Sequence, residues 1–156
     1  RDYFMAHLRE IVGGETFGSV GTLVMIRLRE IDKINVRLGH QRTDMLLKDL
    51  GTVLYEAGNG HPGQRAGRLK GGEFAVVCPT YDDPAAAARD IHGRLMERWL
   101  PNWSGEVPDL FNLAAVQYQR QQPVGELLAA ADEALARSEM LGANSCYADT
   151  GKSRFS

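Results

Sequence analysis

The spacing of apolar residues along the chain predicts five helices and four strands. Repeats of three and four residues indicate helices over residues 2–12, 30–38, 42–57, 84–100 and 124–141. Apolar runs typical of strands cover residues 22–28, 64–69, 73–78 and 110–119. This order, αβααββαβα, predicts a mixed α/β (α+β) domain in which helices cover a largely antiparallel sheet.

Glycine, proline and tryptophan mark the ends of several elements. The stretch KGG at residues 70–72 is expected to form a hairpin tip between the second and third strands. Gly142 is expected to end the last helix, and Pro101 the fourth. Trp99 and Trp103 flank this proline, and we expect them to cover the end of a core helix. The alternative is an exposed tryptophan that marks a partner surface.

Length and composition suit one domain. The chain has 156 residues, of which 44% are hydrophobic and 24% charged, as is typical of a globular domain with its own core. It begins without an initiator methionine, and its first residues already follow a helical repeat. We therefore expect residues 1–156 to be a single domain excerpted from a larger, multidomain protein.

Charge and cysteine usage narrow the function classes. Eighteen basic and 20 acidic residues give a net charge of −2, which argues against a broad basic surface for nucleic acid. No apolar run approaches the roughly 20 residues that a membrane helix needs. Cys78 and Cys146 stand in unrelated contexts, as expected in a reducing compartment. The composition predicts a soluble domain that faces the cytosol.

Two common kinds of site find no support in the sequence. Residues 58–63, GNGHPG, match the glycine spacing of a dinucleotide-binding loop, but a helix is predicted before them and a strand after them, the reverse of what that loop needs. The histidines lack carboxylate or cysteine partners at ligand spacing; they are His7, His40, His61 and His92. We expect no cofactor and no metal ion.

Three stretches of the chain together carry a family pattern. Residues 26–44 read IRLREIDKINVRLGHQRTD, residues 68–77 read RLKGGEFAVV, and residues 131–144 read ADEALARSEMLGAN. In order and spacing they resemble the GGDEF family of diguanylate cyclases, which make cyclic di-GMP from GTP. The resemblance covers nearly the whole chain. It implies a palm-like sheet of the kind shared by nucleotide cyclases and polymerases.

The resemblance places a guanine-recognising pair on Asn35 and Asp44. An amide and a carboxylate can together read the donor and acceptor groups on the edge of a guanine. Asn and Asp are also common at helix starts and turns, so a structural or vestigial role competes with this interpretation. We treat the pair as a candidate nucleotide-binding site that has become vestigial.

The resemblance also implies acidic metal ligands, and their positions hold Arg27 and Gly72. RLKGGEF aligns with the family's RLGGDEF without a gap, which puts Gly72 at the catalytic acid. A guanidinium at 27 would repel a cation about 4 Å away by about 4 kcal/mol per unit charge at an effective dielectric near 20. We therefore expect no metal ion and no catalytic residue. Glu73 is expected to be a hairpin carboxylate near Lys70 or Arg68.

The residues that would hold phosphates also differ from the family pattern. Its basic residues fall on Asp32, Glu139 and Ala143, and two of these reverse the charge. The family's product-inhibition site falls on residues 61–64, HPGQ, and is absent. The resemblance therefore predicts a degenerate domain that is not an enzyme.

Degenerate GGDEF domains are typically joined to an EAL domain, which hydrolyses or binds cyclic di-GMP. The chain looks most like those of inner-membrane cyclic di-GMP receptors with tandem GGDEF and EAL domains, which control adhesin proteolysis and biofilm formation. We expect a regulatory, autoinhibitory module on the cytoplasmic side. Its implied partners are the EAL domain and a signalling helix of the same protein, and cyclic di-GMP is expected to bind the partner domain. A homodimer is also possible, and no nucleic acid is expected to bind.

Two other functions stay open. In the first, Asn35 and Asp44 bind GTP without turnover, and the domain tunes a tethered cyclic di-GMP phosphodiesterase. In the second, the chain is an active cyclase, which would need metal-ion catalysis without the acidic ligands.

Overall fold

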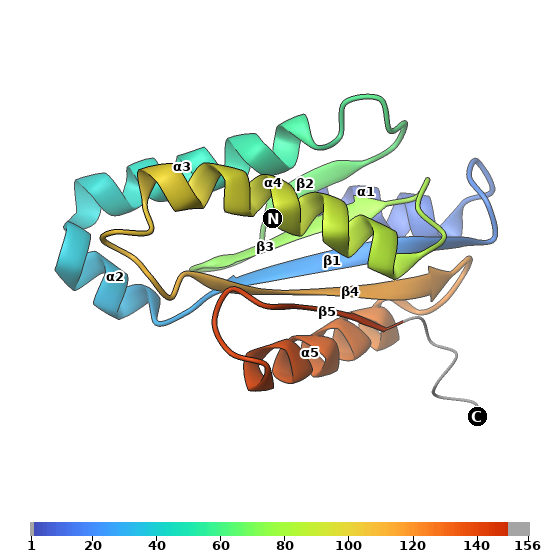
Figure 1. Cartoon of the computed structure of the whole chain (residues 1–156). Coiled ribbons are helices and arrows are strands. Elements are labelled where there is room, and N and C mark those ends of the chain that lie inside the picture. Colours follow the sequence, from blue (N-terminus) through green and yellow to red (C-terminus); the bar gives the residue numbers. More distant parts are fainter. Residues whose placement is uncertain (1, 150–156) are drawn as a thin grey trace.

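The fold is seen in a computed structural model that describes residues 2–149 (Figure 1). Its elements, in chain order, are α1 (Asp2–Gly13), β1 (Val20–Leu28), α2 (Ile31–Leu38), α3 (His40–Glu56), β2 (Arg65–Arg68), β3 (Glu73–Cys78), α4 (Pro84–Asn102), β4 (Phe111–Gln119), α5 (Val124–Met140) and β5 (Cys146–Asp149). All the predicted helices and strands are present in the predicted order.

The strands form one sheet in the order β2-β3-β1-β4-β5. Strand β1 lies in the middle and pairs antiparallel with β3 and β4, and β2 pairs antiparallel with β3. The α+β class and the largely antiparallel sheet are therefore confirmed. Strand β5 was not predicted. It pairs with β4 in parallel, and its four half-buried residues, CYAD, are at the lower limit of length for a run that indicates a strand.

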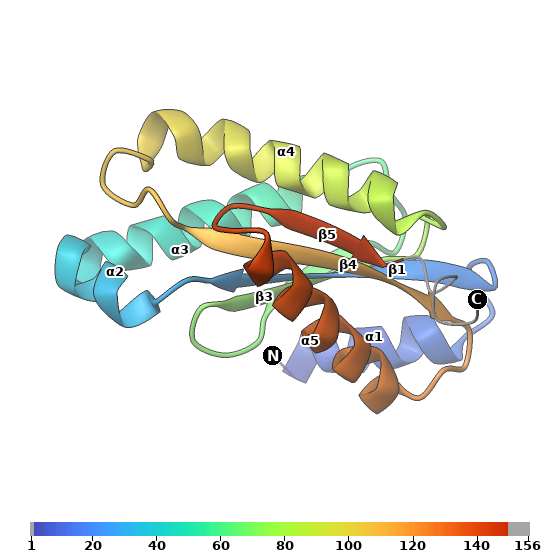
Figure 2. The same cartoon turned by 60° about the horizontal axis from the view of Figure 1, so that its bottom comes forward.

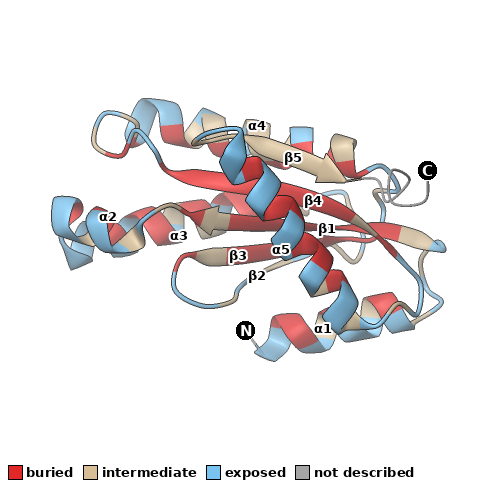
Figure 3. Cartoon of the chain, turned by 90° about the horizontal axis from the view of Figure 1, so that it is seen from below, coloured by how far each residue is buried: buried red, intermediate tan, exposed pale blue. Residues whose placement is uncertain are grey.

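Helices cover both faces of the sheet (Figure 2). Helices α1 and α5 pack on one face, and α2, α3 and α4 pack on the other. Side chains of β1 alternate between the two cores, with Leu23 and Met25 toward α1 and α5, and Val24 and Ile26 toward the opposite layer. Figure 3 shows this burial along the strands and on the inward sides of the helices. By the same alternation, Arg27 lies on the α5 face.

Helix α4 differs from its prediction at its end. Pro101 lies within the last turn, and the helix continues to Asn102. A proline so close to the end removes one helical hydrogen bond without interrupting a following turn. Among residues 2–149, no helix combines the length and the apolar character needed to cross a membrane.

The two tryptophans are both buried. The indole N–H of Trp99 donates to the carbonyl of Val107 at 2.8 Å. The indole N–H of Trp103 donates to Asp49 Oδ2 of α3 at 2.9 Å. The expectation that they cover the end of a core helix is confirmed. The alternative of an exposed tryptophan at a partner surface is wrong.

Candidate functional site

The β2–β3 hairpin tip lies beside the end of β1. Glu73 N–H donates to the carbonyl of Lys70 at 2.8 Å, and Gly71 adopts a positive φ of 49°, which glycine tolerates best. The sheet register pairs Glu73 directly with Arg27 of β1. The predicted hairpin is therefore confirmed, and it brings a carboxylate opposite the arginine.

Three carboxylates surround the guanidinium of Arg27. Its Nε donates to Glu73 Oε1 at 3.0 Å. Its Nη1 donates to Glu139 Oε1 at 3.1 Å, and its Nη2 donates to Asp132 Oδ1 at 3.2 Å. Glu73 comes from β3, whereas Asp132 and Glu139 come from α5. We call these four residues the Arg27 cluster. It joins the hairpin to α5 through one side chain.

The position of Glu73 corrects one expectation. Glu73 was expected near Lys70 or Arg68 in its own hairpin. Its carboxylate instead binds Arg27 on the neighbouring strand, and Arg68 Nε donates to the carbonyl of Gly71 at 3.0 Å. The reason is the sheet register, which places residues 27 and 73 side by side.

The charges of the Arg27 cluster change the electrostatic argument. Burial lowers the pKa of Arg27, but the hydrogen bond and charge of Glu73, together with Glu139 and Asp132, outweigh it and raise this pKa above its ordinary value. One guanidinium and three carboxylates carry a net charge of −2. The repulsion expected of Arg27 applies to an isolated guanidinium, so it overstates the cost of bringing a cation here.

The residues present nevertheless do not fit the divalent cations that the family pattern implies. One oxygen of each of the three carboxylates already accepts a hydrogen bond from Arg27, so a metal ion would have to compete with its guanidinium. Within residues 2–149, no group of three or more His, Cys, Asp or Glu side chains is arranged to hold a metal ion. The obstacle is competition for the carboxylates rather than simple repulsion.

Gly72 stands where the alignment expects the catalytic acid. Its carbonyl accepts a 2.9 Å hydrogen bond from Leu28 N–H. A Cβ built on Gly72 would lie 2.9 Å from Leu28 Cβ, closer than such atoms normally approach. Leu28 is buried, with 5% of its surface exposed, so it has little room to yield. A side chain at position 72 would therefore require the hairpin backbone or Leu28 to shift.

A buried polar network beside the Arg27 cluster was missed from the sequence. Asn112 of β4 donates to Ser138 Oγ at 3.1 Å and to the carbonyl of Gly142 at 2.8 Å. Its Oδ1 accepts from Arg29 Nη1 at 2.6 Å. This network fixes the end of α5 that carries Glu139. The available signal was a single polar residue inside the apolar run FNLAAV.

The predicted guanine pair lies on two adjoining helices. Asn35 is half-buried on α2 and Asp44 is exposed on α3. Neither side chain makes a hydrogen bond or ion pair with another residue in the described part of the chain. Their role in binding guanine stays a prediction.

The other positions of the family pattern have local structural roles. Asp32 is exposed in the first turn of α2, where its negative charge interacts favourably with the positive end of the helix dipole. His61 Nδ1 lies 3.2 Å from Thr80 Oγ1, and Gln64 Nε2 donates to the carbonyl of Ala57 at 3.1 Å. These two residues therefore hold the loop before β2.

A family model described as diguanylate cyclase, GGDEF domain, matches residues 1–145. The chain belongs to the GGDEF family. The family assignment places the chain in cyclic di-GMP signalling. A search of curated proteins gives no match.

Solved GGDEF structures share the fold at low sequence identity. The GGDEF domain of DgcB from Caulobacter crescentus, in complex with c-di-GMP, is 21% identical with a TM-score of 0.71, over 94% of this chain and 86% of that chain. The active GGEEF domain of a Vibrio cholerae diguanylate cyclase is 19% identical with a TM-score of 0.65, over 95% and 90%. These likenesses confirm the palm-like fold of the family.

A third structure places the same fold within a longer protein. The S helix-GGDEF-EAL segment of Vibrio cholerae LapD, bound to c-di-GMP, is 18% identical with a TM-score of 0.72. The match covers 95% of this chain and 34% of that one. GGDEF domains of this fold therefore occur next to EAL domains and signalling helices.

Proposed function

We propose that this chain is a catalytically inactive GGDEF domain that acts as a regulatory and interaction module in a cyclic di-GMP receptor. The observation that carries the proposal is the Arg27 cluster. A guanidinium, rather than a carboxylate, points into the position of the expected metal site and engages the carboxylates around it. A domain that keeps its fold but whose metal site is occupied by a guanidinium is expected to act through contacts between its surface and other domains.

The structure of the hairpin supports the same proposal. An acid at Gly72 would bring its Cβ within 2.9 Å of Leu28 Cβ, so the hairpin would have to shift to accept one. Arg27 then ties this hairpin to α5. These ion pairs hold the hairpin against α5, as suits a module that presents one fixed surface to a partner.

We propose that the partners are an EAL domain and a signalling helix in the same protein. In LapD a GGDEF domain stands between an S helix and an EAL domain, in a structure bound to c-di-GMP. By this analogy the chain is one domain of a longer inner-membrane receptor, lies on its cytoplasmic side and helps to hold it autoinhibited. Cyclic di-GMP would then bind the EAL domain and release the contact.

Calorimetry and a turnover assay on this chain test the loss of activity. Titration with GTP and Mg²⁺ is expected to give no heat of binding, and incubation with both is expected to give no cyclic di-GMP. The active Vibrio cholerae GGEEF domain serves as the positive control for turnover. Formation of cyclic di-GMP by the chain would falsify the proposal.

A second candidate function is GTP binding without turnover, which would tune a tethered phosphodiesterase. It is favoured by the side chains of Asn35 and Asp44, which have no partners in residues 2–149 and so remain available to a ligand. Micromolar GTP binding that Asp44→Ala removes, without product, would support this function over the first. Asn59→Ala, in an exposed turn, is the matched control.

The interaction role is tested in the full-length receptor. Asn35→Ala is expected to leave receptor output at the wild-type level, since the first proposal assigns no nucleotide to this domain. A change in output that accompanies loss of GTP binding would shift the conclusion to the second function.

A further inference from the structure

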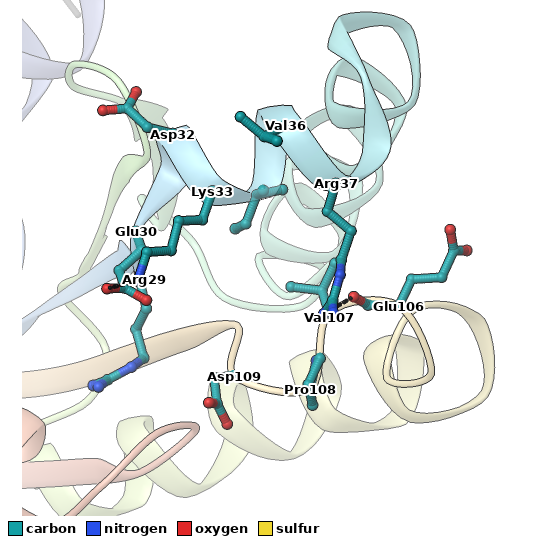
Figure 4. A pocket seen from close by; sticks show the side chains of 11 residues that line it. Arg29, Glu30, Asp32, Lys33, Val36, Arg37, Glu106, Val107, Pro108 and Asp109 are labelled. Atoms are coloured by element: carbon teal, nitrogen blue, oxygen red, sulfur yellow. Dashed lines mark hydrogen bonds and ion pairs between the residues drawn. The ribbon is translucent and has the colours of Figure 1, made fainter.

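A cavity of about 620 Å³ opens between α2 and residues 106–109, with an apolar floor that includes Ile34 (Figure 4). Three basic and four acidic side chains line it, and one of the acids, Glu106, is bound by Arg42 of α3. The charges around the cavity therefore balance, and they select no ion of either sign. A surface that carries a single sign of charge lies elsewhere, along the free edge of β2.

Strand β2 is at one edge of the sheet and has a single neighbouring strand, β3 (Figure 3). Leu69 N–H donates to the carbonyl of Glu73 at 2.8 Å, and in an antiparallel pair such bonds recur at every second residue, here back to Arg65. The backbone N–H and C=O groups of Ala66 and Arg68 therefore point away from β3. In the described part of the chain, no residue outside the sheet forms a hydrogen bond with these four groups.

Helices cover both faces of β2 and leave its edge accessible. On one face, Phe4 of α1 lies directly against Gly67, and α3 packs on the other face. The first and last residues of the strand, Arg65 and Arg68, are exposed. Another chain can therefore pair with β2 only along its edge.

The side chains along this edge are basic and lack acidic partners. Arg65 and Lys70 are exposed, and their side chains make no hydrogen bond or ion pair with another residue in 2–149. The guanidinium of Arg68 donates to the carbonyl of Gly71 at 3.0 Å, which leaves its charge without a carboxylate. Three positive charges therefore stand at the edge without an ion pair among residues 2–149.

The sign of these charges distinguishes between the chains that could pair here. Charged side chains on an edge strand oppose indiscriminate pairing with other edges. If two copies of β2 paired antiparallel in register, Arg65 of one copy would face Arg68 of the other, and like charges opposite each other are destabilising. The edge therefore disfavours a second copy of this chain and favours a strand that carries carboxylates.

We propose that the edge of β2 is the docking site for an extended acidic segment of a partner protein. The segment would add a strand to the sheet through the free backbone groups of Ala66 and Arg68. Two of its carboxylates, three positions apart, would pair with Arg65 and Arg68, whose side chains lie on opposite faces of the sheet. The inference rests on the proposed interaction role and adds the surface and the chemistry of the partner.

The test is an NMR titration of the isotope-labelled chain with a designed peptide. The peptide consists of threonine and valine with two glutamates three positions apart, and it is about eight residues long, within the usual length of a strand. The amides of Ala66 and Arg68 are expected to exchange with solvent about tenfold more slowly when the peptide is present at about ten times its Kd.

Two pairs of matched controls separate strand pairing from simple attraction. Arg65→Gln/Arg68→Gln is expected to weaken binding about fivefold, because two exposed ion pairs are lost. Arg89→Gln/Arg120→Gln removes the same charge from exposed positions on α4 and after β4, and it should leave the Kd unchanged. Of two peptides that are N-methylated at alternate residues, the one that loses the N–H groups facing β2 should not bind, and the other should bind as before.

Several outcomes would overturn the proposal. Equal weakening in Arg89→Gln/Arg120→Gln would show non-specific attraction, as would binding that survives both patterns of N-methylation. A lysine peptide of the same design that binds as tightly would remove the role of charge, and the absence of any binding would remove the site. A dimer of the chain that protects the Ala66 and Arg68 amides would replace the partner with a second copy and so contradict the proposal. None of these outcomes bears on the turnover assay, so the two proposals can fail separately.

Discussion

Asn144 is predicted to be one of the most sensitive single positions for stability. It has a positive φ of 61°, and its Oδ1 accepts from the N–H groups of Leu110 and Phe111 at 3.0 and 3.2 Å. Its Nδ2 donates to the carbonyl of Pro108 at 2.8 Å. One side chain therefore fixes the turn through which the chain enters β4.

The cost of Asn144→Ala can be worked out from these contacts. Leu110 and Phe111 are buried, so two backbone N–H groups lose their acceptor away from water, at about 1–3 kcal/mol each. Alanine also tolerates the left-handed backbone less well than asparagine, by about 1 kcal/mol. The expected loss is about 3–7 kcal/mol, a large share of the roughly 5–15 kcal/mol that stabilises a typical domain.

Urea unfolding of the chain, followed by circular dichroism, measures this loss. Asn144→Asp keeps an acceptor for both N–H groups and gives up only the donor to Pro108, so it should cost about 1 kcal/mol. Asn59→Ala, in an exposed turn, should change the free energy of unfolding by less than about 0.5 kcal/mol. The reasoning is refuted if Asn144→Ala costs no more than Asn144→Asp.

Two further predictions concern packing and thiol chemistry. Gly67→Ala would place a Cβ 2.4 Å from Phe4 Cβ on α1 and should destabilise the chain by about 2 kcal/mol in the same assay. Gly93→Ala is the control: a Cβ there would have nothing within 4 Å, and alanine favours a helix more than glycine does, so it should stabilise the chain slightly. Burial raises the pKa of the thiols of Cys78 and Cys146. Iodoacetamide should therefore modify half-buried Cys146 only at a higher pH than a free cysteine needs, and buried Cys78 only after unfolding. Rapid labelling of both thiols at neutral pH would contradict this.

Much of the fold was predictable because its elements carry local signals. The helices have apolar faces that repeat at helical spacing, and the central strand is an apolar run. Gly142, expected to stop the last helix, indeed takes a positive φ of 106° just after it. Strand β5 was missed because CYAD is too short to stand out as an apolar run, and its existence depends on pairing with β4. Local sequence cannot reveal an element defined by a distant partner.

The contacts within the candidate site could not be predicted from the sequence. The family pattern drew attention to residues 27 and 72, yet gave no indication of what Arg27 binds. Arg27 is separated from Glu139 by 112 positions and from Asp132 by 105, so only the packing of α5 on β1 brings them together. The apolar cavity at α2 escaped notice for the same reason, since its two walls are far apart in sequence.

The pairing of Arg27 with Glu139 alters how the departures from the family pattern are understood. Taken one at a time, an arginine in place of an acid and a glutamate in place of a lysine are two separate losses. In the folded chain they face each other at 3.1 Å, so the second compensates the first. A single reversal would leave a partly buried charge beside a like charge, which is costly, whereas the two together keep an ion pair at the same place. The exchange maintains the contact between β1 and α5 while it occupies the carboxylates that a metal ion would need.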